Sequence, residues 1–137
     1  MNEIIHKIKE LNISLNEGIN PSVISTLSKI FDFNFPQDFI DFYTKVNGFS
    51  GYQGFDGHHI WDTTKIEKEA LIFSMNYDMI PFSDSVLFCP WIGFSKQNGK
   101  VYKGYGAATE FNEKTIFVAE TFTDFLELYL ADSDKLY

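Results

Sequence analysis

The chain has 137 residues and a formal net charge of −8, and all eleven of its positively charged residues are lysines. Arginine is the residue that recognises phosphate and guanine with paired hydrogen bonds, and an acidic chain gains nothing from counterion release on DNA. The composition therefore argues against direct binding to nucleic acid. Apolar residues make up 45% and aromatic residues 18% of the chain, which excludes an intrinsically disordered protein.

The sequence also bears on compartment and domain number. No apolar run approaches the roughly 20 residues that cross a membrane, and the start, Met1-Asn2-Glu3-Ile4, lacks the basic and apolar blocks of a secretory signal. Cys89 is the single cysteine, so no disulfide framework or thiolate metal site is available. We expect a cytoplasmic protein with no membrane association and one domain spanning residues 1–137.

Three amphipathic helices are predicted before Phe49. Apolar residues recur at helical spacing in residues 2–11, and again after Asn20-Pro21, which supplies an N-cap and a first-turn proline. Residues 12–20 between these helices are polar and predict an irregular connection. The third helix begins at Pro36, and Asn47-Gly48 ends it because both residues tolerate positive φ. Its apolar stripe consists of Phe39, Phe42, Tyr43 and Val46.

The composition changes after Gly48 and predicts a sheet. Glycine recurs at every third position of residues 51–57, which predicts a loop or hairpin turn because the Gly-Lys-Ser/Thr ending of a phosphate-binding loop is missing. A short strand at residues 58–61 and a helix from Thr64 to about Phe73, opened by a capping box, follow. Residues 76–84 are rich in turn-forming residues and predict an irregular segment.

The remaining strands are predicted at residues 85–94, 101–105, 109–111 and 115–119, and a capping box at Thr121 opens a last helix. Gln97-Asn98-Gly99-Lys100 is a strong hairpin signal. Pro90 cannot donate to a sheet ladder, so it predicts a bulge, an edge or a strand end. Helices, then strands, then a closing helix indicate an α+β fold, with helices packed mainly on one face of a largely antiparallel sheet.

The third helix also carries a family resemblance. A Pro-x-Asp-aromatic helix that ends in Asn-Gly, entered from an amphipathic helix, resembles the opening signature of the SUKH superfamily (Smi/Knr-like). Ile60-Trp61-Asp62, the strands near residues 86–88 and 99–105, and the Phe-x-x-Phe-Leu helix of residues 121–130 resemble its later segments. The similarity covers roughly residues 20 to 132 and implies the same α+β architecture.

No motif for catalysis or metal binding stands out. His58 and His59 are adjacent, and neighbouring residues of a strand point to opposite faces, which argues against a shared metal ion unless the chain forms a loop there. Cys89 lies between Phe88 and Pro90, which predicts a buried, unreactive thiol. The Gly-x-Ser-x-Gly elbow of serine hydrolases is missing. We expect no enzyme activity, no cofactor and no metal site.

The remaining class is a binding protein, in which aromatic anchors dominate the interface energy. Aromatic and acidic residues gather in and after the glycine-rich stretch and around Pro81. The binding residues that we predict are Phe49, Tyr52, Asp56, Trp61, Asp62, Asp78 and Asp84. In the structural alternative, Trp61 and Phe55 belong to the core and the acids are ordinary loop charges. A competing acidic docking face consists of Glu110, Glu113, Glu120, Asp124, Glu127, Asp132 and Asp134.

The resemblance implies an immunity protein, which binds a cognate toxin, often a nuclease in this superfamily, and blocks it without catalysis. Opposite charge speeds encounter, so we expect the toxin to be basic. The superfamily also includes relatives of a fungal cell-wall-integrity regulator, so a second hypothesis is a regulatory or scaffolding domain with an endogenous protein partner. A third hypothesis is an enzyme that uses the His58-His59 region. The sequence leaves the oligomeric state open.

Overall fold

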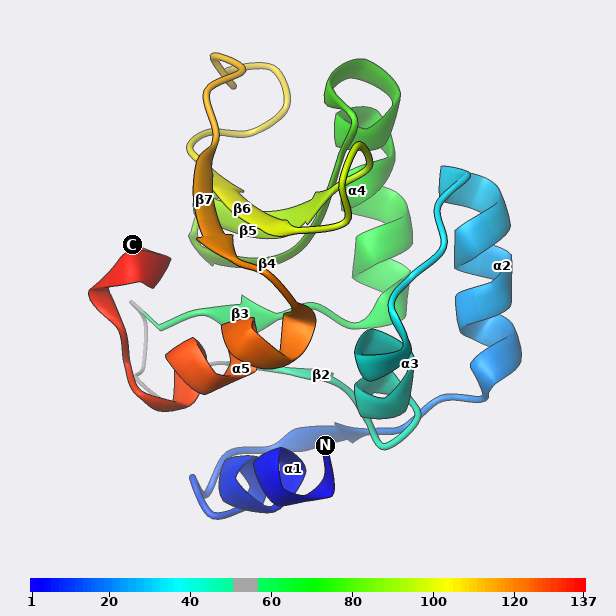
Figure 1. Cartoon of the computed structure of the whole chain (residues 1–137), viewed down its shortest axis with the longest axis vertical. Helices are drawn as coiled ribbons and strands as arrows, with labels where there is room; N and C mark the ends of the chain where they lie inside the picture. Colours follow the sequence, from blue (N-terminus) through cyan, green and yellow to red (C-terminus); the bar gives the residue numbers. More distant parts are fainter. Residues whose placement is uncertain (51–56) are drawn as a thin grey trace.

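The computed structural model describes residues 1–50 and 57–137. Its five α-helices and seven-stranded antiparallel sheet confirm the predicted α+β fold with a closing helix (Figure 1). The helices are α1 (Asn2–Lys9), α2 (Pro21–Phe31), α3 (Gln37–Tyr43), α4 (Thr63–Tyr77) and α5 (Phe122–Leu130). The strands are β1 (Leu15–Glu17), β2 (Val46–Phe49), β3 (His59–Ile60), β4 (Met79–Val86), β5 (Cys89–Ser95), β6 (Val101–Gly104) and β7 (Ile116–Ala119), and a 3₁₀ turn, η2 (Asp134–Leu136), follows α5.

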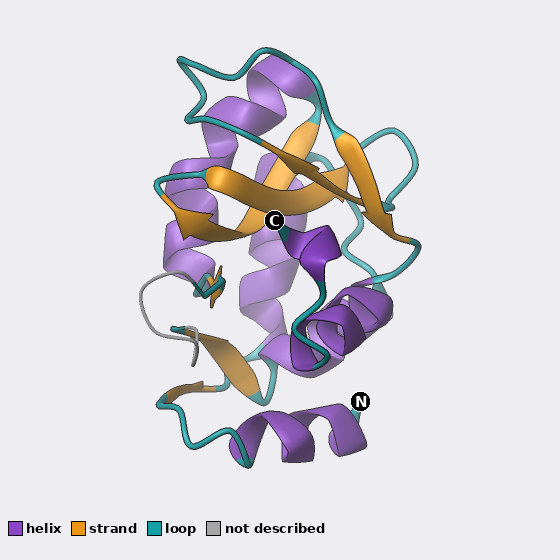
Figure 2. Ribbon diagram, turned by 90° about the vertical axis from the view of Figure 1, so that its left-hand side faces the viewer, coloured by secondary structure: helices purple, strands orange, loops and turns teal. Residues whose placement is uncertain are grey.

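The strands lie in the sheet in sequence order, and each is antiparallel to the next. β4 and β5 form a long pair that runs from Met79 opposite Ser95 to Val86 opposite Cys89. β3 is only two residues long. The strands are therefore shortest at β3 and longest at β4 and β5. Figure 2 shows the longer strands in the upper part of the molecule.

Aromatic rings fill the core where α3 and α5 meet the sheet. Phe39 stacks on Tyr43, with ring centroids 4.4 Å apart, and meets Phe122 of α5 edge-on at 5.1 Å. Phe82 of β4 in turn meets Phe125 of α5 at 5.1 Å. Such pairs add roughly 0.5–1.5 kcal/mol each beyond their burial. Three residues of the predicted stripe, Phe39, Phe42 and Tyr43, are thus confirmed as the core face of α3.

A second, smaller apolar cluster lies on the other face of β5. Ile92 and Phe94 of β5 belong to the main core, whereas Trp91, which alternates with them along the strand, packs with Phe73, Met79 and Phe111. Phe73 comes from α4 and Phe111 from the segment between β6 and β7. α4 therefore contributes to both clusters, because Ile66 and Ala70 on the same helix belong to the main core.

Several predicted boundaries are wrong. Residues 76–84 do not form an irregular segment, because α4 continues to Tyr77 and β4 starts at Met79. Pro81 is accommodated beside a bulge between Pro81 and Ser83, where a missing N–H costs little. Residues 15–17, within the predicted connection, form β1 against β2. No strand forms at residues 109–111.

The end of the third helix also differs from the prediction. α3 ends at Tyr43, and Val46 lies in β2, where it remains buried. Gly48 then has a φ of 74°, and an added Cβ there would lie 2.4 Å from the Ile60 carbonyl oxygen. Glycine is therefore required by the close approach of β2 and β3 as well as by the positive φ. The Asn47-Gly48 signal marks a strand position, not a helix end.

Candidate functional site

A groove of about 980 Å³ lies between the chain around β1–β2 and the turn that joins β4 to β5. Four of the predicted binding residues line this Trp61 groove: Phe49, Trp61, Asp62 and Asp84. The other apolar lining residues are Ile13, Ile60, Val86, Leu87 and Phe88. Tyr52 and Asp56, which were also predicted, lie outside the described residues. The structure therefore brings part of the predicted set together.

Trp61 forms the base of the groove and is only 2% exposed, as the structural alternative held. Its indole N–H donates to Asp84 Oδ1 at 2.7 Å, and the backbone N–H of Phe88 donates to Asp84 Oδ2 at 3.1 Å. The Lys65 ammonium lies 5.0 Å from the centre of the Trp61 ring. Asp84 is itself buried, so its carboxylate fixes the groove wall and is not an exposed docking charge.

Asp62 lies at the edge of the groove and is half-buried. It is the N-cap of α4, because its carboxylate accepts a 2.7 Å hydrogen bond from the Lys65 backbone N–H. The predicted capping box at Thr64 is therefore displaced by two residues. Below it, the Tyr43 hydroxyl donates to the Trp61 carbonyl oxygen at 2.6 Å. Burial raises the pKa of Tyr43 well above its ordinary value, and the charge of Asp62 raises it further.

The turn between β4 and β5 consists of Leu87 and Phe88, which have φ values of 50° and 62°. A two-residue hairpin turn with positive φ at both positions normally contains Asn-Gly or Asp-Gly, because larger side chains clash with the backbone there. Leu87 is nevertheless 81% exposed at the rim of the groove. Sequence reasoning missed this Leu87 turn, since Leu-Phe carries no turn signal and fell inside a predicted strand.

The Leu87 turn is fixed from both sides. Asp84 accepts the Phe88 N–H, and the Gly106 backbone N–H donates to the Phe88 carbonyl oxygen at 2.8 Å. The Phe88 ring meets Trp61 edge-on at 5.7 Å. Leu87 is therefore an exposed apolar side chain on a rigid support. Cys89, directly after the turn, is exposed, so the prediction of a buried thiol is wrong.

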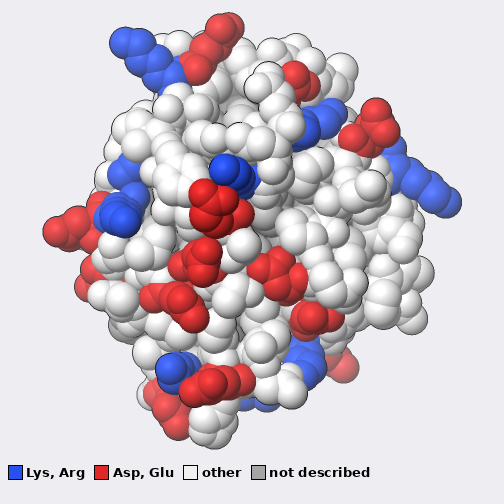
Figure 3. Space-filling view, viewed as in Figure 1, with Lys and Arg blue, Asp and Glu red and all other residues white. Residues whose placement is uncertain are grey.

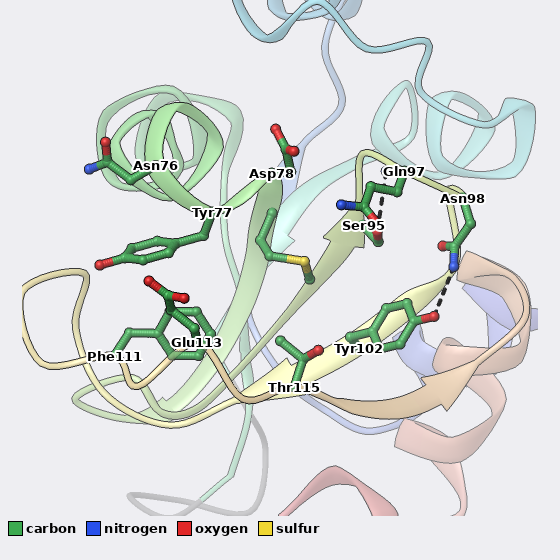
Figure 4. A pocket seen from close by; sticks show the side chains of 11 residues that line it. Asn76, Tyr77, Asp78, Ser95, Gln97, Asn98, Tyr102, Phe111, Glu113 and Thr115 are labelled. Atoms are coloured by element: carbon green, nitrogen blue, oxygen red, sulfur yellow. Dashed lines mark hydrogen bonds between the residues drawn. The ribbon is translucent and has the colours of Figure 1, made fainter.

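Asp78, the remaining predicted residue, does not line the Trp61 groove. It lies at the C-cap of α4 and lines a separate pocket of about 420 Å³ (Figure 4). Glu113, from the competing acidic face, lines the same pocket. Other members of that face, including Asp124 and Glu127, lie on α5, and Figure 3 shows acidic side chains gathered around this helix. The predicted acidic residues are thus distributed over three places.

His58 is fully buried, and its environment is that of a structural residue. Its Nε2 lies 2.6 Å from the Leu136 carbonyl oxygen, and a carbonyl can only accept, so Nε2 carries the proton. Nδ1 then accepts from the Ser83 hydroxyl at 3.3 Å. Burial lowers the pKa of His58, and the nearby charges of His59 and Lys103 act in the same direction, while the Leu136 carbonyl and Asp84 oppose them.

Within residues 1–50 and 57–137, no three or more His, Cys, Asp or Glu side chains are grouped so that they could hold a metal ion. None of the helices in the described part of the chain has the length and apolar character needed to cross a membrane.

The family model for the SMI1/KNR4 family (SUKH-1) matches residues 18–128. The chain belongs to this family. The SUKH-1 match confirms the resemblance predicted from the helix around Phe39, and it extends from just before α2 into α5. It includes the Leu87 turn, the pocket at Asp78 and most of the lining of the Trp61 groove. Comparison with curated proteins finds no match.

Proposed function

We propose that this SUKH-1 chain is a cytoplasmic immunity protein that binds a cognate toxin in a stoichiometric complex and neutralises it without catalysis. The observation that carries the proposal is the Trp61 groove, with the exposed Leu87 beside it, in a chain of this family. A large apolar side chain on a rigid turn is the kind of group that fills a pocket on a protein partner. A fixed turn also loses little conformational freedom on binding, which favours affinity.

The charge distribution supports a basic partner. The net charge of −8 attracts a basic protein at long range. At the groove, the Lys65 ammonium lies over Trp61, while the partly exposed Asp62 carboxylate is available at the edge. We expect the toxin to present an apolar pocket for Leu87 with cationic side chains around it.

The proposal is tested with the product of the toxin gene next to the gene for this chain. Co-expression should relieve toxicity, and the purified proteins should form a complex of fixed stoichiometry. Failure of both observations with every neighbouring toxin gene would remove the proposal. In that case the second hypothesis, a regulatory domain with an endogenous partner, would take its place.

The Asp62→Asn variant tests the groove itself. Asparagine caps a helix as well as aspartate does, so α4 should be intact while one charge is lost. We expect toxin binding to weaken about threefold to tenfold at low salt, and its salt dependence to become shallower. Glu127→Gln on α5 removes the same charge elsewhere and should leave affinity nearly unchanged. If Glu127→Gln weakens binding more than Asp62→Asn does, the docking surface lies on α5 and not at the Trp61 groove.

A further inference from the structure

The pocket at Asp78 has features of a binding site that the Trp61 groove does not share. It lies between the C-terminal end of α4, the β5–β6 hairpin and the chain before β7, and its volume is about 420 Å³ (Figure 4). Met79 and Phe111 are buried at its base, and the half-buried rings of Tyr77 and Tyr102 also line it. This Asp78 pocket has the size of a site for one large side chain or a small molecule.

The aromatic residues of the Asp78 pocket are fixed by hydrogen bonds. The Tyr77 hydroxyl donates to the Ala108 carbonyl oxygen at 3.0 Å, and the Tyr102 hydroxyl accepts from Asn98 Nδ2 at 2.8 Å. Tyr77 also meets Phe111 edge-on, with ring centroids 5.0 Å apart. The rings are therefore held in place before any ligand arrives.

The charge of the pocket has one sign. Asp78 and Glu113 are both exposed carboxylates on its lining, and no lysine is among the described lining residues. Within the part of the chain that the structure describes, neither carboxylate makes a side-chain hydrogen bond or ion pair. Two unpaired carboxylates on the lining of a pocket that also contains fixed aromatic rings favour a cation, because the faces of aromatic rings are themselves electronegative.

We propose that the Asp78 pocket receives the guanidinium group of an arginine side chain from the protein partner. Guanidinium is planar, stacks on aromatic rings and binds carboxylates through paired hydrogen bonds, whereas the ammonium of lysine is a strongly hydrated point charge. The chain contains no arginine, so a second copy cannot supply this group. The assignment of this guanidinium group to a partner protein rests on the proposed function, because that function supplies the partner.

The test uses the ¹⁵N-labelled full chain and a capped arginine, Nα-acetyl-arginine N-methylamide, as the probe. We expect saturable amide shifts centred on residues 76–79, 95–98 and 111–115, with a dissociation constant in the millimolar range, as is typical of a single side chain. The capped citrulline analogue has nearly the same shape without the charge and should bind about tenfold more weakly. The capped lysine should lie between the two.

Variants separate the pocket from general attraction to an acidic protein. Asp78→Asn combined with Glu113→Gln should weaken capped arginine about tenfold. Asn suits the left-handed conformation that Asp78 adopts, at a φ of 56°, and an unchanged spectrum of the free variant verifies folding. Glu127→Gln removes one exposed charge outside the pocket and should leave the affinity unchanged.

The proposal that the Asp78 pocket binds a guanidinium group would be overturned by equal shifts with citrulline, by shifts centred elsewhere, or by an undiminished affinity of the double variant. Free arginine has the same net charge as the capped form, so clearly tighter binding of free arginine than of the capped form would indicate a small-molecule ligand and overturn a protein source. None of these measurements involves the toxin. Their failure therefore leaves the immunity proposal standing, and failure of toxin neutralisation leaves the pocket result standing.

Discussion

At the scale of single residues, Leu87 has a backbone conformation that its side chain disfavours, at a position where the side chain is exposed. An L-amino acid with a bulky side chain loses roughly 1 kcal/mol in the left-handed region, and an exposed leucine regains none of this by burial. Leu87 has a φ of 50° and is 81% exposed. Binding of its side chain to a partner would explain why a leucine occupies this position.

This explanation predicts opposite effects of Leu87→Asn on stability and on binding. Asparagine accepts positive φ, so the free energy of unfolding should rise by about 0.5–1 kcal/mol. Toxin affinity should fall at least about tenfold, because an anchor side chain is lost. Urea unfolding and binding titrations measure the two effects.

The matched control is Met75→Gln on α4, which removes another side chain that is 74% exposed and should leave both quantities nearly unchanged. Loss of stability in Leu87→Asn, or wild-type affinity, would show that the leucine has a packing role instead.

At the scale of secondary-structure elements, Asp38 connects α3 to α5. Its Oδ1 accepts from the Phe39 N–H at 2.9 Å. Its Oδ2 accepts from both the backbone N–H and the hydroxyl of Thr123, each at 2.8 Å, across 85 residues of sequence. Asp38 therefore stabilises the N-terminal end of α5 as well as its own helix. The two helices are fixed against each other where Phe39 meets Phe122.

Asp38→Ala should lower the free energy of unfolding by about 1.5–3 kcal/mol, because donors of α5 lose a charged acceptor. Asp41→Ala is the matched control: Asp41 is an exposed acid on the same helix that accepts from Gln37 at 2.9 Å, and its loss should cost less than about 0.5 kcal/mol. Urea unfolding followed by circular dichroism compares the two. Similar losses in both variants would contradict a connecting role for Asp38.

At the scale of the whole molecule, polar side chains in the sheet and next to it bind the C-terminal segment. Lys103 of β6 donates to the backbone oxygens of Lys135 and Tyr137 at 2.8 and 2.7 Å, and His58 donates to the carbonyl oxygen of Leu136. Burial lowers the pKa of Lys103. Because these residues lie far apart in the sequence, the protonation state of His58 should affect the folding equilibrium of the whole chain.

Stability should therefore decrease as the pH falls below about 6.5, the ordinary pKa of histidine. The pKa of His58 is lowered in the folded chain, so the unfolded chain takes up the proton first as the pH falls, and unfolding becomes more favourable. Its full contribution is present above the unfolded pKa and is lost as the pH falls toward the folded pKa. Urea midpoints between pH 7.5 and 5.5 would measure this trend.

His58→Gln should flatten this pH dependence, whereas His6→Gln, which alters an exposed histidine that pairs with Glu10 at 3.0 Å, should preserve it. A slope that persists unchanged in His58→Gln would assign the pH dependence to other groups.

The sequence by itself determined the features that depend on neighbouring residues. The Asn20 and Thr121 caps are confirmed by hydrogen bonds to Ser22 and Asp124, because a cap involves only the first helical turn. The hairpin at Asn98-Gly99 is confirmed for the same reason, with Gly99 at a φ of 72°. Hydrophobic spacing also identified Phe39, Phe42 and Tyr43 as the core face of α3.

Only the tertiary structure decided which distant residues meet. Phe49, Trp61, Asp62 and Asp84 share one groove because the antiparallel pairing of β2, β3 and β4 brings them together, whereas Asp78 belongs to a pocket with Glu113. The Leu87 turn forms against local preference because Val86 pairs with Cys89 and Asp84 accepts the Phe88 N–H. Local signals reflect energies within a few residues, while pairing and burial act across the whole chain and override them.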